Sequence, residues 1–218
     1  MIWDWEFAAE VFPQILEAFV EVTLGLTAAA GAIAIALGLV LALGRRSHIM
    51  WVSWPTYGIV EFVRSTPIPI QLFLVYFGLP EVGIRLSAWV TGVAVLGVHY
   101  AAYMSEVYRA GIDAIPKGQW EASTALSLSP RRTWQAVVLP QVVRRVLPSM
   151  GNQIIALFKE TPFVIVISLA EMVTTAEQIG GSTFRYLEPL TIAGFIFLLA
   201  SYPTSVLMRR LEIRLGHA

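Results

Sequence analysis

Long apolar segments separated by short polar ones run through most of the chain. Residues 22–44, 86–105 and 189–208 carry no Asp, Glu, Lys or Arg, and each is at least about 20 residues long. That length suits an α-helix crossing the hydrocarbon core of a bilayer. Two further segments, 51–80 and 146–170, are long enough to span but contain charged side chains. The pattern therefore predicts five transmembrane helices.

The composition supports an all-α integral membrane protein. Of 218 residues, 56% are apolar and 14% are charged, whereas soluble domains average about 25% charged residues. The net charge of zero argues against nucleic acid binding, and the absence of cysteine excludes thiolate metal sites. We expect one transmembrane domain over residues 1–218, embedded in the lipid bilayer.

Lys and Arg are distributed unevenly among the predicted loops. The loop at 45–46, the long loop between the third and fourth spans and the C-terminal tail hold eleven of them. The loops on the other side hold only Arg85 and Arg185. Cytoplasmic loops are enriched in Lys and Arg, so we expect the N-terminus outside and the long loop in the cytoplasm.

The long cytoplasmic loop contains a polar insert over about 116–140. Its residues Gly118–Leu126 suit a short helix, and Ser129 followed by Pro130 is typical of an N-cap and a first helical residue. A second short helix carrying Trp134 is expected to end at Pro140. Spacing alone leaves two interpretations open: a helix–turn–helix projecting into water, or a loop lying on the membrane with its tryptophans at the headgroups.

Charged pairs occur inside or beside the predicted spans. Glu61 and Arg64 are three residues apart, and Glu106, Arg109 and Asp113 form a similar ladder. Residues three or four apart face each other on a helix. Within each group the opposite charges are expected to neutralise one another and to hold neighbouring helices together.

Lys159 and Glu160 are adjacent, so they point in different directions on a helix, and Asn152 shares a face with Lys159. Ionisable residues inside a membrane usually face a partner or a cavity. The candidates for lining a substrate path are Glu160, Asn152, Gln71, Tyr103, Lys159 and Arg64.

The polar insert resembles the cytoplasmic signature of ABC importer permeases, which reads E-A-A, three residues, G, nine residues, then I-x-L-P. Here the matching positions are Glu121, Ala122, Ser123, Ser127 and 137–140. Ser123 replaces an Ala and Ser127 replaces the Gly. Because serine adopts positive φ reluctantly, we expect the turn at Ser127 to be made in another way.

The resemblance extends over roughly residues 15–215. The segments 61–80, 101–122 and 139–162 are similar to blocks of the polar amino acid type of permease, although Pro162 stands where a Ser is usual. The opening "WDWEF" and several substitutions also resemble permeases for ectoine and hydroxyectoine.

This resemblance implies the fold of a type I ABC importer permease, with a coupling helix between helices three and four. It implies that the coupling helix docks on a cytoplasmic ABC ATPase dimer, which binds ATP and Mg, whereas this chain holds no cofactor and is not an enzyme. It further implies a second permease subunit, identical or paralogous, in a prokaryotic inner membrane. An extracytoplasmic substrate-binding protein is expected at the outer loops and at Asp4, Glu6 and Glu10. The residues expected to couple to the ATPase are Gly118, Glu121, Ala122, Ser123, Leu126 and Ser127.

Two other functions compete with this interpretation. An ion-coupled secondary transporter or channel subunit would work without ATP, but it gives no reason for the spaced signature. An intramembrane serine protease would need a nucleophile beside a base. His99 lies in a span, but Ser182 lacks the G-x-S-x-G elbow, so His99 is expected to be a packed or hydrogen-bonded helix residue.

Overall fold

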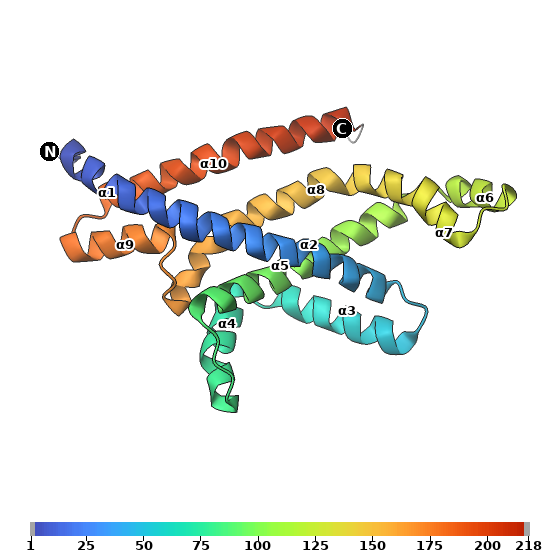
Figure 1. Cartoon of the computed structure of the whole chain (residues 1–218), viewed down its shortest axis with the longest axis horizontal. Coiled ribbons are helices and arrows are strands. Elements are labelled where there is room, and N and C mark those ends of the chain that lie inside the picture. The colour runs from blue at the N-terminus through green and yellow to red at the C-terminus, as the bar shows by residue number, and fades with distance from the viewer. Residues whose placement is uncertain (1–2, 216–218) are drawn as a thin grey trace.

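The computed structural model describes residues 3–215, which form helices and connecting turns without any strand in that range (Figure 1). Most long helices run side by side, and the polar insert projects from one end of the bundle. The α-helices are α1 (Trp5–Ala18), α2 (Leu24–Arg45), α3 (Met50–Ser65), α4 (Ile68–Phe73), α5 (Ala88–Asp113), α6 (Lys117–Ala125), α7 (Pro130–Arg132), α8 (Leu139–Glu160), α9 (Met172–Thr183) and α10 (Leu187–Arg214).

The first span begins well before residue 22, because α1 and α2 form one continuous helix joined by a π-helical turn, Phe19–Thr23. Its 41 residues correspond to about 60 Å, twice the thickness of the hydrocarbon core. The α1 half is amphipathic: Ala8, Val11 and Ile15 are buried, and Val11 and Ile15 pack against residues of α9 and α10. The apolar α2 half corresponds to the predicted span.

The predicted span over 51–80 is broken in the middle. The segments Met50–Ser65 and Ile68–Val82 meet at a bend of 106°. Thr66 is extended (φ −105°, ψ 134°) because the ring of the following proline, Pro67, disfavours the helical conformation in the residue before it. After the break, α4 leads into a π-helical turn (Leu74–Gly78) and a 3-10 turn (Leu79–Val82) that point away from the bundle (Figure 1).

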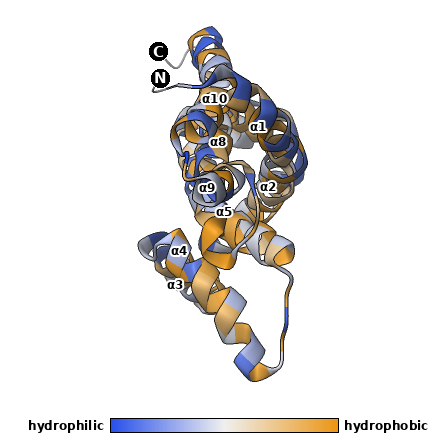
Figure 2. Ribbon diagram, turned by 90° about the vertical axis from the view of Figure 1, so that its left-hand side faces the viewer, coloured by the Kyte–Doolittle hydropathy of each residue, from blue (hydrophilic) through white to orange (hydrophobic). Residues whose placement is uncertain are grey.

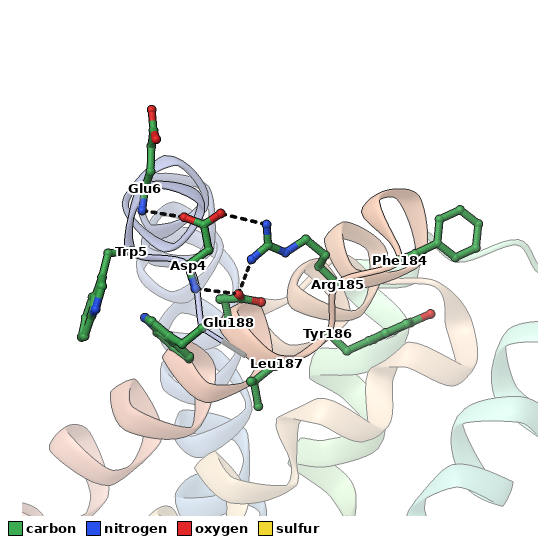
Figure 3. Close-up of a pocket in the computed structure, with 9 residues that line it drawn as sticks. Asp4, Trp5, Glu6, Phe184, Arg185, Tyr186, Leu187 and Glu188 are labelled. Atoms are coloured by element: carbon green, nitrogen blue, oxygen red, sulfur yellow. Dashed lines mark hydrogen bonds and ion pairs between the residues drawn. The ribbon is translucent and has the colours of Figure 1, made fainter. Parts of the chain in front are cut away.

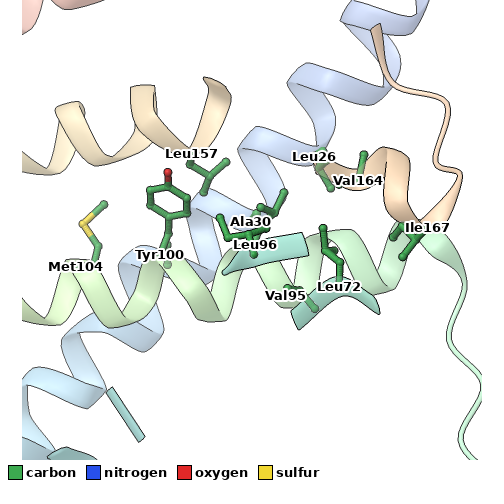
Figure 4. Packing of buried hydrophobic residues seen from close by; sticks show 12 residues of the cluster. Leu26, Ala30, Leu72, Val95, Leu96, Tyr100, Met104, Leu157, Val164 and Ile167 are labelled. Atoms are coloured by element: carbon green, nitrogen blue, oxygen red, sulfur yellow. The ribbon is translucent and has the colours of Figure 1, made fainter. Parts of the chain in front are cut away.

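The main apolar core lies where α2 and α5 run together, and α4 and the end of α8 complete it (Figure 4). Gly38 lets these two helices approach closely: a Cβ added there would lie 2.5 Å from Cβ of Met104. The core residues that are essentially inaccessible to solvent are Leu26, Ala30, Ala34, Leu72, Leu96, Met104, Leu157 and Val164.

Pro140 does not end the second helix of the insert, which corrects the expectation from sequence. The helix runs without a break from Pro130 to Ile167. A π-helical turn, Thr133–Val138, precedes Pro140, which occupies the first turn of α8. In a regular α-helix, proline lacks the N–H for the hydrogen bond and its ring clashes with the carbonyl four residues earlier. The π-helical turn before Pro140 departs from that regular geometry, so proline is tolerated there. The short helix α9 was not predicted at all.

Within residues 3–215, three helical segments are long and apolar enough to cross a membrane, and the bent pair would be a fourth if it forms one span. Many large apolar residues of the long helices are exposed, as expected for lipid contact, and hydrophobic stretches run along the helices of the ribbon in Figure 2. The predicted span at 86–105 corresponds to α5, which lies inside the bundle with thirteen buried residues and is not among these segments. The number of five spans and the orientation remain predictions.

Candidate functional site

The polar insert is a compact helical corner built on the end of the bundle. The predicted first helix is present as α6, and the rings of Trp120 and Trp134 meet edge to face at 5.6 Å. Both rings pack against a small apolar cluster from α5 and α8 that includes Ile112 and Val142. The tryptophans therefore anchor the insert to the protein, which disfavours the interpretation as a loop with its tryptophans at the headgroups.

One face of α6 does not pack against this apolar cluster and is exposed. Ser123 is buried and donates a hydrogen bond to the carbonyl of Gln119 at 2.8 Å, so it belongs to the supporting side. Leu126 is 73% exposed although it is a large apolar residue. We call the exposed members of the set expected to couple to the ATPase the loop surface: Gly118, Glu121, Ala122, Leu126 and Ser127.

The turn after α6 contradicts the expectation for Ser127. Its φ is 51°, so the serine takes the left-handed conformation that a glycine would take in the same place. The turn is made in the glycine-like way, and the added Cβ carries a strain cost of about 1 kcal/mol. The N-cap is confirmed: the Ser129 side chain accepts a hydrogen bond from the backbone N–H of Arg132.

A second group of polar residues lies in the middle of the bundle. The hydroxyl of Tyr100 donates a hydrogen bond to Oε2 of Glu160 at 2.7 Å, which joins α5 to the last residue of α8. The rings of Tyr100 and Tyr103 are 6.1 Å apart, and the guanidinium of Arg64 lies 5.3 Å from the centre of the Tyr103 ring. The structure therefore connects three of the path candidates, Glu160, Tyr103 and Arg64.

Gln71, another of the path candidates, makes hydrogen bonds at the bend between α3 and α4. Its amide donates to the carbonyl oxygens of Val63 and Thr66 and to the Thr66 hydroxyl, at 2.8, 3.0 and 2.9 Å. Its oxygen faces Nδ1 of His99 at 3.2 Å. Gln71 thus satisfies the backbone at the α3–α4 bend and ties that bend to α5. The prediction that His99 is a hydrogen-bonded helix residue is confirmed.

Asn152 and Lys159 lie apart from this group. Both are exposed, as their shared helix face predicts, and neither makes a hydrogen bond or ion pair within residues 3–215. The adjacent Glu160 faces inward instead. Sequence reasoning placed these side chains correctly relative to one another but missed Tyr100, whose partner on another helix has no local signal.

The predicted charge pairs form, and arginines from the end of α2 join them. Arg64 lies 3.4 Å from Glu61, and Arg109 lies 2.7 Å from Glu106 and 3.2 Å from Asp113. Arg45 and Arg46 add bonds to Glu106 and to Asp113, respectively. Helical spacing predicts the first three pairs. It gives no sign of the contacts of Arg45 and Arg46, because their partners lie on another helix.

At the opposite end of the bundle, a pocket of about 830 Å³ lies between the start of α1 and the α9–α10 connection (Figure 3). Asp4 caps α1 and lies 3.0 Å from Arg185, which also binds Glu188. The hydrogen bond from Arg185, with the backbone bond from Phe7, holds the pKa of Asp4 below its ordinary value. Asp4 is therefore engaged within the chain, while Glu6 and Glu10 are exposed.

Comparison with known proteins gives consistent results along the chain. The family model described as "Binding-protein-dependent transport system inner membrane component" matches residues 34–217. A probable amino-acid ABC transporter permease protein of Sinorhizobium fredii is 41% identical over 209 residues, covering 96% of this chain and 90% of the relative. The arginine transport system permease protein ArtQ of Bacillus subtilis is 38% identical, covering 88% of this chain and 89% of its own length.

Solved structures agree with the fold. A chain from the crystal structure of an amino acid ABC transporter with histidines superposes with a TM-score of 0.91 at 33% identity, covering 98% of this chain and all of that chain. A chain of the MetNI methionine ABC transporter superposes with a TM-score of 0.63 at 20% identity, covering 87% of this chain and 92% of that chain. This second likeness concerns the fold alone.

Proposed function

Because this chain belongs to the family of binding-protein-dependent transport system inner membrane components, we propose that it forms the translocation path of an ATP-driven importer. It is an amino-acid ABC transporter permease and a multi-pass protein of the inner membrane. Such a permease is not itself an enzyme, since ATP hydrolysis lies in a separate subunit. The proposed substrates are polar amino acids or their derivatives.

The observation that carries the proposal is the loop surface. It exposes Leu126 and Glu121 on a helix whose other side is anchored by Trp120. An exposed apolar side chain on a firmly supported helix suits a protein partner, because its burial adds affinity without a cost for ordering the loop. The proposed partner is a cytoplasmic ATPase dimer, which supplies the sites for ATP and Mg.

The proposed path passes the polar group around Glu160. A zwitterionic amino acid carries both charges, and this region offers the carboxylate of Glu160 and the guanidinium of Arg64, with the Tyr103 ring between α5 and α3. Asn152 and Lys159 are proposed to face a second permease subunit, identical or paralogous. A binding protein is proposed to deliver substrate at the end that carries Glu6 and Glu10.

The narrower proposal for the substrate is ectoine or hydroxyectoine. It is supported by the sequence resemblance noted at residues 3–7. Two of the similar proteins are described with arginine and with histidines, so these amino acids are the proper competitors.

The test is uptake by proteoliposomes that contain this permease, its ATPase and its binding protein. The proposal predicts uptake that requires ATP and the binding protein, with ectoine, arginine and histidine compared as substrates. Uptake driven by an ion gradient without ATP would contradict the proposal and favour a secondary transporter. If arginine or histidine is taken up with ATP and ectoine is not, the proposal of an ATP-driven importer stands and only the ectoine assignment is contradicted.

A further inference from the structure

One carboxylate near the end of α5 gathers arginines from three helices. Glu106 accepts hydrogen bonds from Arg45, the last residue of α2, and from Nε and Nη2 of Arg109 at 3.1 and 2.7 Å. Nη1 of Arg64 on α3 lies 3.7 Å from the same carboxylate. The side chains of Glu106 and Arg45 are only 22% and 11% exposed. Water therefore screens these charges weakly.

A second carboxylate, that of Glu61, lies near two of the same arginines but cannot take the place of Glu106. Glu61 lies 3.4 Å from Arg64 and 4.0 Å from Arg45, and it is more exposed than Glu106. If Glu106 lost its charge, Arg45 and Arg64 would face each other with Glu61 alone between them. Like charges in a partly dry site repel strongly, so α3 would be pushed away from α2.

Helix α3 depends on such polar contacts because little apolar packing holds it. Val60 is its only buried residue, and the main apolar core contains no residue of α3. The helix is bounded by the short connection 46–49 on one side and by the 106° bend on the other. Elements with few buried apolar contacts open most easily. The packed pair α2 and α5 is the rigid part, and α3 is the part that can move.

The charged residues around Glu106 contact residues beside the polar insert at one end and residues beside the proposed substrate path at the other. Arg109 binds Asp113, the last residue of α5, at 3.2 Å. The next carbonyl, that of Ala114, accepts a hydrogen bond from Arg145 of α8 at 2.6 Å just before α6 begins. In the other direction, the guanidinium of Arg64 lies over the Tyr103 ring beside the Tyr100–Glu160 contact.

We propose that Glu106 is the positioning residue of an ionic latch, formed with Arg45, Arg64 and Arg109, that holds α3 against α2 and α5. Opening of this latch transmits movement of the coupling loop to the polar group around Glu160. The inference rests on the proposed function, because it requires a loop that an ATPase moves.

The test uses the absence of cysteine in the native chain. Spin labels at Val52→Cys on α3 and Ala110→Cys on α5, both exposed positions, report the distance between these helices in the assembled transporter. Glu106→Gln is expected to lengthen and broaden that distance without nucleotide. It is also expected to raise ATP hydrolysis in the absence of binding protein about fivefold. Glu106→Asp should restore part of both values.

Wild-type distances and wild-type coupling in Glu106→Gln would overturn the latch. The matched control is Glu177→Gln, which neutralises an exposed carboxylate on α9 and should behave as wild type. If Glu106→Gln fails to assemble, Glu61→Gln loosens the same contact more mildly, and unchanged distances there overturn the proposal. Absence of ATP-driven uptake in the wild type would refute the proposed function instead, while the label distances still test the latch itself.

Discussion

The hydroxyl of Tyr100 on α5 donates a hydrogen bond to Glu160 at the point where α8 gives way to a 3-10 turn, Thr161–Ile167. The contact lies within a predicted apolar span, where polar groups are costly and usually serve function. It joins the helix that enters the coupling loop to the helix that leaves it. The path proposed for substrate therefore lies next to both helices that flank the polar insert.

Tyr100→Phe tests this contact. The variant removes a hydrogen bond to a charged group, which is worth about 1.5–3 kcal/mol, so the kcat/KM of uptake should fall about tenfold or more. Glu160→Gln should lower it as well. Tyr202→Phe, on the exposed side of α10, is the control. Uptake kinetics that match the wild type in both Tyr100→Phe and Glu160→Gln would remove this contact from the path.

Ser127→Gly should make the chain more stable. Glycine adopts the φ of 51° without steric cost, which relieves about 1 kcal/mol of strain before the entropy of the unfolded chain is subtracted. The expected result is a rise in Tm of about 1–3 °C in detergent. Ser127→Ala removes the hydroxyl but keeps the Cβ, so it should show no rise. A lower Tm for the glycine variant would show that the serine is not strained.

Gly38→Ala should destabilise the contact between α2 and α5. The new methyl group would lie 2.5 Å from Cβ of Met104 and 3.0 Å from the carbonyl oxygen of Ala101, and overpacking of this kind costs about 1–3 kcal/mol. Gly58→Ala is the matched control, because no atom lies within 4 Å of its added Cβ. It should be neutral or slightly stabilising. Thermal unfolding of both variants distinguishes packing from helix propensity.

Asp4→Asn should weaken the end of the fold that carries the start of α1 at neutral pH. Asparagine caps a helix about as well as aspartate, so the variant isolates the ion pair with Arg185. The pKa of Asp4 is lowered in the folded chain, so its contribution is present above its unfolded pKa of about 3.9 and is lost as the pH falls through the folded value. The Tm difference from wild type should therefore vanish in acid. A difference that persists there would point to capping instead.

The sequence predicted what depends on local spacing. Apolar runs located most of the long helices, and the order Ser129–Pro130 located a helix start. Residues three or four apart located the Glu61–Arg64 and Glu106–Arg109 pairs. Each of these follows from helix geometry within a few residues, so no knowledge of the packing was needed.

Features that depend on other helices were missed. The bend after Thr66 starts from a local cause, Pro67, but the hydrogen bonds from Gln71 and its contact with His99 on α5 come from residues outside that step. The continuation of the helix through Pro140 needed a π-helical turn, which the sequence does not mark. The left-handed Ser127 shows the opposite case, in which packing of the insert overrides a residue preference.

The polar insert is proposed to receive force from an ATPase through its loop surface. Glu121→Lys reverses one exposed charge there without touching the packing of Trp120. The decisive measurement is ATP hydrolysis and amino acid uptake in the same proteoliposomes, with Glu177→Lys on α9 as the control reversal. The account predicts that Glu121→Lys inserts normally but loses uptake coupled to ATP hydrolysis, while the control keeps it. Normal coupled transport by Glu121→Lys would contradict the account.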